Sequence, residues 1–299
     1  MRFAAIDVGS NAVRLLLSQV LVDGGPPVFK KDSLVRFPLR LGEDAFLGRR
    51  ISAEKSAQLV QVMSAFRRLI DAYAPLAFRA CATSALREAE NRVEIVRAVR
   101  REAGIELEVV DGRTEAEIIY SNHAERDLDQ DAPYLYIDVG GGSTQLTLFA
   151  EGRSVDSRSF NIGTIRILRE IVTRNQWREM KSWIRQSCEP RGSLTAIGSG
   201  GNINKVFLLA GKKPGRPLSR KTLNEIERYL SHYDYEEKVR LLGLRPDRAD
   251  VIVPALEIFL HVMNWAGIEK IHVPFIGLSD GLIHRLYERY KGGGAPEAA

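Results

Sequence analysis

Two aspartates in this chain stand at the ends of apolar runs, directly before turns rich in glycine and hydroxyl groups. Asp7 and Asp138 occupy these positions. Glycine N–H groups can approach an anion closely, and neighbouring hydroxyl and amide side chains donate further hydrogen bonds to phosphate oxygens. Because carboxylates repel phosphate, we expect the two aspartates to bind Mg²⁺ directly or through water. The predicted phosphate-binding residues are Gly9, Ser10 and Asn11 in the first turn and Gly140, Gly141, Gly142, Ser143 and Thr144 in the second.

These two segments form an internal repeat. Each consists of an apolar run, an aspartate, a glycine turn and a second apolar run, so each predicts a β-hairpin with a polar tip. A single such tip is better explained as an ordinary hairpin turn. The matched pair favours phosphate binding, because glycine-rich tips are poor choices for stability alone.

A third glycine cluster follows the apolar segment 194–197. Gly198, Gly200 and Gly201 precede a helical pattern, and a helix N-terminus attracts anions. The cluster therefore predicts a further anion or nucleotide site, with a plain strand-to-helix turn as the alternative.

Alternating strand and helix patterns in both halves predict an α/β fold with two lobes. The expected first lobe is 1–127, completed by a C-terminal helix at 278–290. The expected second lobe is 128–277, after a charged linker near 127–133. Residues 291–299 are expected to form a flexible tail.

Composition places the chain among ordinary globular proteins. Its 299 residues are 44% hydrophobic and 27% charged, and the net charge of +5 suits a polyanionic partner. The apolar stretch 251–267 contains Glu257 and His261 and is short for a membrane span, so we expect a buried helix. Cys81 and Cys188 form no metal or redox motif, which predicts buried thiols. A cytoplasmic protein without membrane contact is expected.

The ordered motifs resemble those of the exopolyphosphatase and guanosine pentaphosphate phosphohydrolase (Ppx/GppA) family, in its short two-domain form, within the actin and sugar-kinase superfamily. The resemblance implies two actin-like, ribonuclease H-like lobes, each a mixed sheet flanked by helices, with a cleft between them. The matching segments are 7–11, 40–43, 82–91, 112–116, 137–144, 163–166, 198–201 and 245–254.

The same resemblance implies roles for single residues. Glu115 matches the general base, Asp138 matches the magnesium-associated acid, and Arg87 and Arg166 match positions near the substrate. Asp7, Asp138 and Glu115 are therefore the candidate metal ligands, for Mg²⁺ with Mn²⁺ as the alternative. The resemblance also implies a homodimer.

This chain departs from the family pattern beside the proposed metal. Gln145 stands where the family usually has a glutamate, and Arg113 and Thr114 make the segment before Glu115 less acidic. Loss of a carboxylate there is expected to weaken metal binding or to change metal preference.

The resulting expectation is a phosphohydrolase that removes terminal orthophosphate from inorganic polyphosphate or guanosine pentaphosphate; nucleic acid is not expected to be a partner. The alternatives are a phosphotransferase of the same superfamily and a non-catalytic sensor of polyphosphate or nucleotide, which Gln145 favours. Four basic residues form a further candidate surface for guiding a polyanion. They are Arg36, Arg40, Arg49 and Arg50.

Overall fold

The computed structural model describes residues 1–121, 132–151, 153–189 and 192–293, and it divides the chain into two compact units. Unit 1 comprises Met1–Asn122 and Gly277–Ala299, and unit 2 comprises His123–Ile276. Each unit has one mixed sheet flanked by helices, so the expected fold class is confirmed. Most of the expected linker, and residues 294–299 of the expected tail, lie outside the described residues.

The sheet of unit 1 has the strand order β3-β2-β1-β4-β5. The β1–β2 and β2–β3 pairs are antiparallel, whereas β1, β4 and β5 run parallel to one another. The parallel strands therefore share one carboxyl edge. The strands are β1 (Arg2–Val8), β2 (Val13–Leu21), β3 (Val28–Phe37), β4 (Ala77–Ala82) and β5 (Leu107–Val109).

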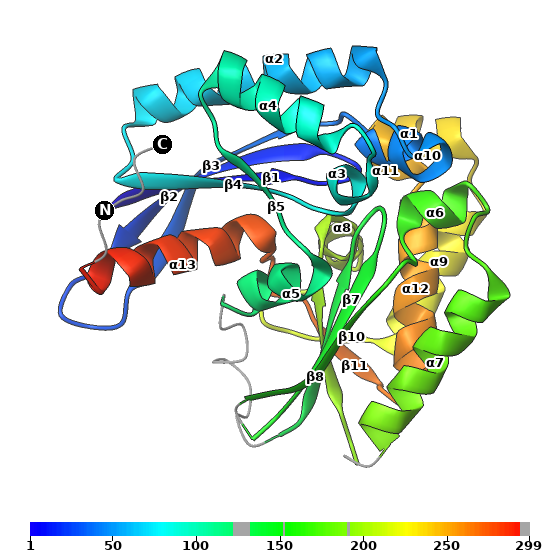
Figure 1. Ribbon diagram of the computed structural model, residues 1–299. Helices are drawn as coiled ribbons and strands as arrows, with labels where there is room; N and C mark the ends of the chain where they lie inside the picture. The colour runs from blue at the N-terminus through cyan, green and yellow to red at the C-terminus, as the bar shows by residue number, and fades with distance from the viewer. Residues whose placement is uncertain (122–131, 152, 190–191, 294–299) are drawn as a thin grey trace. The chain divides into compact units, whose positions relative to one another are not determined.

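Helices cover both faces of this sheet. Figure 1 shows α2 and α4 over one face and α13 over the other. Buried Leu59, Met63 and Phe66 of α2 join the apolar core formed with the sheet. The helices of unit 1 are α1 (Leu41–Gly48), α2 (Ala53–Tyr73), α3 (Ser84–Glu88), α4 (Arg92–Ala103), α5 (Gly112–Tyr120) and α13 (Leu278–Lys291).

Helix α13 is far from the rest of unit 1 in sequence but packs closely on its sheet and on α5. Phe3 of β1 makes edge contacts with the rings of Tyr287 and Tyr290. Asp280 pairs with Lys31 of β3 at 2.6 Å. A Cβ on Gly281 would lie only 1.8 Å from the carbonyl oxygen of Ile118 in α5. This backbone approach requires glycine.

The sheet of unit 2 has the order β10-β11-β9-β6-β7-β8. Strands β6, β9 and β11 are parallel, and the remaining pairs are antiparallel. The strands are β6 (Tyr134–Val139), β7 (Thr144–Ala150), β8 (Arg153–Phe160), β9 (Thr195–Ser199), β10 (Leu218–Ser219) and β11 (Lys270–His272).

The core of unit 2 includes α12, which covers most of the apolar stretch 251–267 that is too short for a membrane span. This helix packs against four other helices and β6, and seven of its side chains are buried. No helix among the described residues is long and apolar enough to cross a membrane. The helices are α6 (Thr164–Leu168), α7 (Arg174–Cys188), α8 (Gly201–Leu209), α9 (Arg220–Ser231), α10 (Tyr235–Arg240), α11 (Pro246–Ala249) and α12 (Ile252–Trp265).

Both cysteines are buried free thiols, as expected. Burial raises the pKa of Cys81 to about 12 and that of Cys188 to about 11. Because the thiolate is the reactive form, both thiols are expected to be unreactive near neutral pH.

Asn91 precedes α4 and is followed three residues later by Glu94, a spacing typical of a helix cap, but Asn91 makes no capping hydrogen bond. Its amide instead bonds both the N–H and the carbonyl of Ile51, forty residues away, at 3.1 and 2.9 Å. The side chain therefore ties α4 to the start of α2.

We predict that Gly281→Ala lowers the free energy of unfolding of unit 1 by about 3 kcal/mol, because its methyl group meets rigid backbone rather than a side chain that can turn away. Denaturant unfolding measures this. Gly277→Ala is the control, since a Cβ there has no atom within 4 Å. Equal stability of the two variants would contradict the close packing of α13 on α5.

Candidate functional site

The two repeated hairpins have the same tip geometry. In the first, the N–H of Gly9 donates to the carbonyl of Ala12 at 3.1 Å. In the second, the N–H of Gly140 donates to the carbonyl of Ser143 at 2.9 Å. Each tip is thus a four-residue turn that follows a strand ending in Asp-Val. The internal repeat in the sequence corresponds to a repeat of backbone structure.

In unit 1, three predicted segments follow the three parallel strands β1, β4 and β5. The turn containing Ser10 follows β1, α3 with Arg87 follows β4, and α5 with Glu115 follows β5. The hydroxyls of Ser10 and Ser84, both buried, lie 2.8 Å apart and connect the first two segments. Carboxyl ends of parallel strands are the usual location of ligand sites in α/β folds.

Glu115 lies in the early part of α5, and only 8% of its surface is exposed. The N-terminus of this helix is capped by Asp111, which accepts a hydrogen bond from the Thr114 N–H at 2.7 Å. This hydrogen bond lowers the pKa of Asp111. The Glu115 carboxylate lies 3.4 Å from Nη1 of Arg87, which also donates to the Val110 carbonyl at 2.8 Å. Arg87 therefore orients the predicted base.

In unit 2, the start of α6 is hydrogen-bonded to the hairpin tip. The N–H groups of Thr164 and Ile165 donate to the carbonyls of Gly140 and Gly141 at 3.1 and 2.9 Å. Nε of Arg166 donates to the Gly142 carbonyl at 2.7 Å. Three consecutive tip carbonyls are thus bonded to one segment.

This arrangement leaves donors of the tip available to a ligand. The N–H groups of Gly141 and Gly142 have no hydrogen-bond acceptor in the described part of the chain. Successive N–H groups of this kind form anion-binding concavities. The tip can therefore bind phosphate oxygens through its backbone.

Two predicted phosphate-binding side chains of unit 2 donate hydrogen bonds to the protein backbone. The hydroxyl of Thr144, which is fully buried, donates to the carbonyl of Ile162 at 2.7 Å. Arg166 is 8% exposed and uses Nε for Gly142. We infer that both residues shape the tip. Gly140 and Gly141 are its half-buried part, whereas Gly142 and Ser143 are buried.

The third glycine cluster lies beside Asp138. Strands β6 and β9 are neighbours, and Asp138 is in register with Ser199. Gly200 has a φ of 110°, and a Cβ on it would lie 3.0 Å from the Val139 carbonyl oxygen and 3.7 Å from the Asp138 carboxylate. The sheet of unit 2 thus gathers Asp138, the hairpin tip and the start of α8.

The two aspartates face different cross-strand partners. Asp7 is opposite Arg14 and forms an ion pair with it at 2.6 Å. Asp138 is opposite Gln145. The guanidinium neutralises Asp7, whereas Gln145 contributes a neutral amide next to Asp138. Nε2 of Gln145 donates to Oγ of Ser143 at 3.0 Å.

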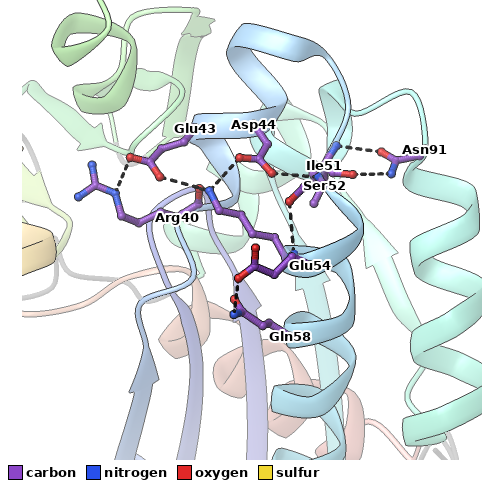
Figure 2. A network of polar contacts seen from close by, with 9 residues as sticks. Arg40, Glu43, Asp44, Ile51, Ser52, Glu54, Gln58 and Asn91 are labelled. Atoms are coloured by element: carbon purple, nitrogen blue, oxygen red, sulfur yellow. Dashed lines mark hydrogen bonds and ion pairs between the residues drawn. The ribbon is translucent and has the colours of Figure 1, made fainter.

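The expected basic cluster near the start of α2 is largely engaged in ion pairs. Arg40 pairs with Glu43 within the network shown in Figure 2. Arg49 and Arg50 pair with acidic residues of the segment 90–94 at 3.3 and 3.4 Å. These pairs reduce the positive charge that the cluster offers to a polyanion.

A surface cavity of about 510 Å³ adjoins the same network, at the junction of α1 and α2. Its lining includes both acidic and basic groups, among them Asp44, Glu54 and Lys55. The Lys55 ammonium already donates to the Arg40 carbonyl and to the carboxylates of Glu43 and Asp44, at 2.9 to 3.2 Å. The network stabilises the α1–α2 connection and contains none of the predicted catalytic residues.

The carboxylate oxygens of the aspartates near the tips are of the type that Mg²⁺ prefers as ligands. Among the residues that the structure describes, no three acidic, histidine or cysteine side chains gather as a metal site. Mg²⁺ usually keeps several waters and takes one or two protein carboxylates together with substrate phosphates. The carboxylate of Asp7 binds Arg14, and that of Asp138 lies beside the third glycine cluster.

Sequence reasoning did not single out Arg14 and Ser84. Arg14 follows from hairpin register, since a four-residue tip places it opposite Asp7, as Gln145 is opposite Asp138. Gly163 packs on the second tip so closely that a Cβ would lie 2.4 Å from the Gly141 carbonyl oxygen. Ser84 gave no recognisable signal, because its partner Ser10 is distant in sequence.

Comparison with known proteins places these features in a family. The model of the Ppx/GppA phosphatase family matches residues 22–290. Exopolyphosphatase 1 of Mycobacterium tuberculosis is 25% identical, over 95% of this chain and 88% of that protein. A bifunctional 3-dehydroquinate synthase/phosphatase of Fusobacterium nucleatum is 26% identical, over 88% of this chain and 43% of that protein.

Solved structures with the same fold include an exopolyphosphatase from Cytophaga hutchinsonii, with a TM-score of 0.79, 21% identity and 98% coverage of both chains. A Ppx/GppA family member from Aquifex aeolicus has a TM-score of 0.75 at 23% identity, over 97% of this chain and 98% of that chain. The family resemblance drawn from the sequence motifs is confirmed.

We predict that Gly163→Ala displaces the second tip, because the added methyl group overlaps the backbone of Gly141 and Gly142. The expected result is a loss of about 1 to 3 kcal/mol in the free energy of unfolding. Binding of pyrophosphate, followed by calorimetry, should weaken in parallel. Gly48→Ala is the control, since a Cβ there has no atom within 4 Å. Unchanged pyrophosphate affinity in Gly163→Ala would show that this tip does not bind phosphate.

Proposed function

We propose that this chain, which belongs to the Ppx/GppA phosphatase family, removes orthophosphate from the end of inorganic polyphosphate. Family membership bears out the expected enzyme class, a phosphoanhydride hydrolase. The observation that carries the specific proposal is the buried carboxylate of Glu115, held beside Arg87 at the sheet edge where the first hairpin tip also lies.

The proposed reaction is direct attack of water on the terminal phosphorus. The carboxylate of Glu115 orients the water and accepts its proton while the new P–O bond forms. The bridging P–O bond breaks, and its electron pair stays on the shortened chain. The products are orthophosphate and a chain one phosphate shorter. Positioning and charge neutralisation supply most of the catalysis in such reactions.

The hairpin tips support the positioning part of this proposal. Backbone N–H groups of Gly141 and Gly142 would bind non-bridging phosphate oxygens, with the hydroxyl of Ser143 as a further donor. Because Gln145 donates to Oγ of Ser143, that oxygen acts as acceptor toward Gln145, and its own proton can point to an anion. A glutamate at position 145 would instead attract this proton.

Asp138 is the proposed protein ligand for Mg²⁺ or Mn²⁺, with Asp7 and Glu115 as the further candidates from the sequence. Bound metal would neutralise charge on the phosphoryl oxygens. With Gln145 opposite Asp138, the site has one fewer carboxylate than the family pattern implies. We expect metal binding to depend strongly on substrate phosphates for this reason.

Polyphosphate is preferred to guanosine pentaphosphate as the substrate. The M. tuberculosis relative and the C. hutchinsonii protein are both named exopolyphosphatases. The specific observation favouring a second function, a non-catalytic sensor, is the neutral amide of Gln145 beside Asp138. Homodimer formation and a cytoplasmic location stay predictions from the sequence.

We predict that Glu115→Gln lowers the rate of orthophosphate release from polyphosphate by about 10² to 10⁴-fold, the usual effect of removing a general base. Phosphate release with Mg²⁺ present measures this, and circular dichroism checks that the variant folds. Glu117→Gln is the matched control, because Glu117 lies on the same helix and is exposed. Native activity in Glu115→Gln would remove Glu115 from the mechanism. Tight polyphosphate binding by the native protein without any release would favour the sensor.

We also predict that Gln145→Glu makes stability more dependent on magnesium. Two carboxylates on neighbouring strands repel, so without divalent cations the variant should lose about 1 to 3 kcal/mol of unfolding free energy. Millimolar Mg²⁺ should restore more of the melting temperature than it does in the native protein. Gln186→Glu, an exposed change of the same charge in unit 2, is the control. Equal magnesium effects in both variants would place the metal away from Asp138.

A further inference from the structure

A long stretch of unit 2 contains basic residues and no acidic ones. No aspartate or glutamate occurs between Glu189 and Glu225. The stretch includes the third glycine cluster, α8, the connection to β10 and the start of α9. Its basic residues within the described chain are Lys205, Lys212, Lys213, Arg216, Arg220 and Lys221.

Three of these cations lie on one tight turn, which we call the basic turn (residues 211–217). The N–H of Arg216 donates to the carbonyl of Lys213 at 3.1 Å. Between them stand Pro214 and Gly215, and Gly215 has a φ of 81°. This is the pattern of a type II turn, with proline second and glycine third. The turn holds the Lys213 and Arg216 backbones close together, and Lys212 precedes them directly.

The cations of the basic turn differ from their neighbours in having no acidic partner. Arg220 pairs with Glu269, and Lys221 lies 4.0 Å from Glu225. Lys212, Lys213 and Arg216 are exposed and form no ion pair with any residue in the described ranges. Like charges gathered without counter-charge repel one another, so a fixed turn of this kind is suited to an anionic ligand.

The topology of unit 2 places the basic turn at the edge that carries the phosphate-binding tip. Strands β6, β9 and β11 are parallel, and their carboxyl ends carry the tip, Gly200 and the segment after His272. Strand β10 is antiparallel to β11, with Leu218 opposite Ile271. The residues just before Leu218 therefore lie toward the carboxyl end of β11.

The separation along this edge suits a chain-like ligand. Strand β10 follows the basic turn, and strand β6 precedes the tip. In the order β10-β11-β9-β6, these two strands are separated by three strand-to-strand spacings. At the usual strand spacing this is about 14 Å. A ligand held by its end at the tip reaches the basic turn only if it extends along the edge.

We propose that the basic turn binds the distal part of an inorganic polyphosphate chain whose end is held at the β6–β7 tip. This inference rests on the proposed function and names the part of the protein that favours long chains. The basic turn contains no aromatic side chain. Binding of single-stranded nucleic acid usually requires aromatic platforms for the bases, which favours polyphosphate over RNA.

The test compares two triple variants with the same change in net charge. Lys212→Gln/Lys213→Gln/Arg216→Gln removes the charges of the basic turn but keeps Pro214 and Gly215, which set its backbone. Arg174→Gln/Arg178→Gln/Arg228→Gln is the control, since these exposed arginines of unit 2 form no ion pair among the described residues. Binding of end-labelled long-chain polyphosphate is measured with EDTA present, and hydrolysis of long-chain polyphosphate and tripolyphosphate is measured with Mg²⁺.

For the basic-turn variant we expect about tenfold weaker binding of long-chain polyphosphate, since three exposed contacts of ordinary surface strength add up to this factor. The KM for the long chain should rise similarly, with kcat and tripolyphosphate hydrolysis unchanged. Equal binding by both variants overturns the proposal, as does an equal loss for long and short substrates. Loss of single-stranded RNA binding with polyphosphate binding intact also overturns it. If the native protein hydrolyses neither substrate, the proposed function fails, and the binding measurement still decides this inference.

Discussion

The close approach of Gly163 to the β6–β7 tip is the constraint on which the candidate site of unit 2 depends. Only the absence of a Cβ lets the chain at Gly163 pass the backbone of Gly141 and Gly142. From there α6 begins, and its first residues bond three tip carbonyls. With the carbonyls bonded on one side, the tip directs N–H groups away from α6. The anion site that we propose at this tip would therefore consist mainly of backbone N–H groups.

Parallel strands explain how segments distant in sequence meet in each unit. In unit 1 the carboxyl ends of β1, β4 and β5 bring Ser10, Arg87 and Glu115 to one edge. In unit 2 the carboxyl ends of β6 and β9 bring Asp138 beside Gly200. The same edge receives the basic turn, because β10 enters the sheet in the opposite direction. The shared carboxyl edge of the parallel strands therefore explains the positions of the candidate site residues and of the proposed chain-binding surface.

Charge partners distinguish the repeated halves. The backbone of the two hairpins is equivalent, but Asp7 binds Arg14 while Asp138 faces Gln145. The guanidinium of Arg14 offsets the charge of Asp7, whereas the side chain opposite Asp138 is a neutral amide. The family resemblance implies a glutamate at position 145. In this chain the side chain there is a neutral amide that donates to Oγ of Ser143.

The sequence alone determined the family, the fold class and the two hairpin tips, because these depend on local runs of apolar residues, aspartate and glycine. It also predicted the burial of both cysteines and of α12. Contacts between distant segments needed the tertiary structure. The hydrogen bonds of Asn91 to Ile51, of Thr144 to Ile162 and of Arg166 to Gly142 each join segments that are apart in the sequence. Local patterns specify backbone conformation, whereas the partner of a side chain depends on which distant segment the fold places next to it.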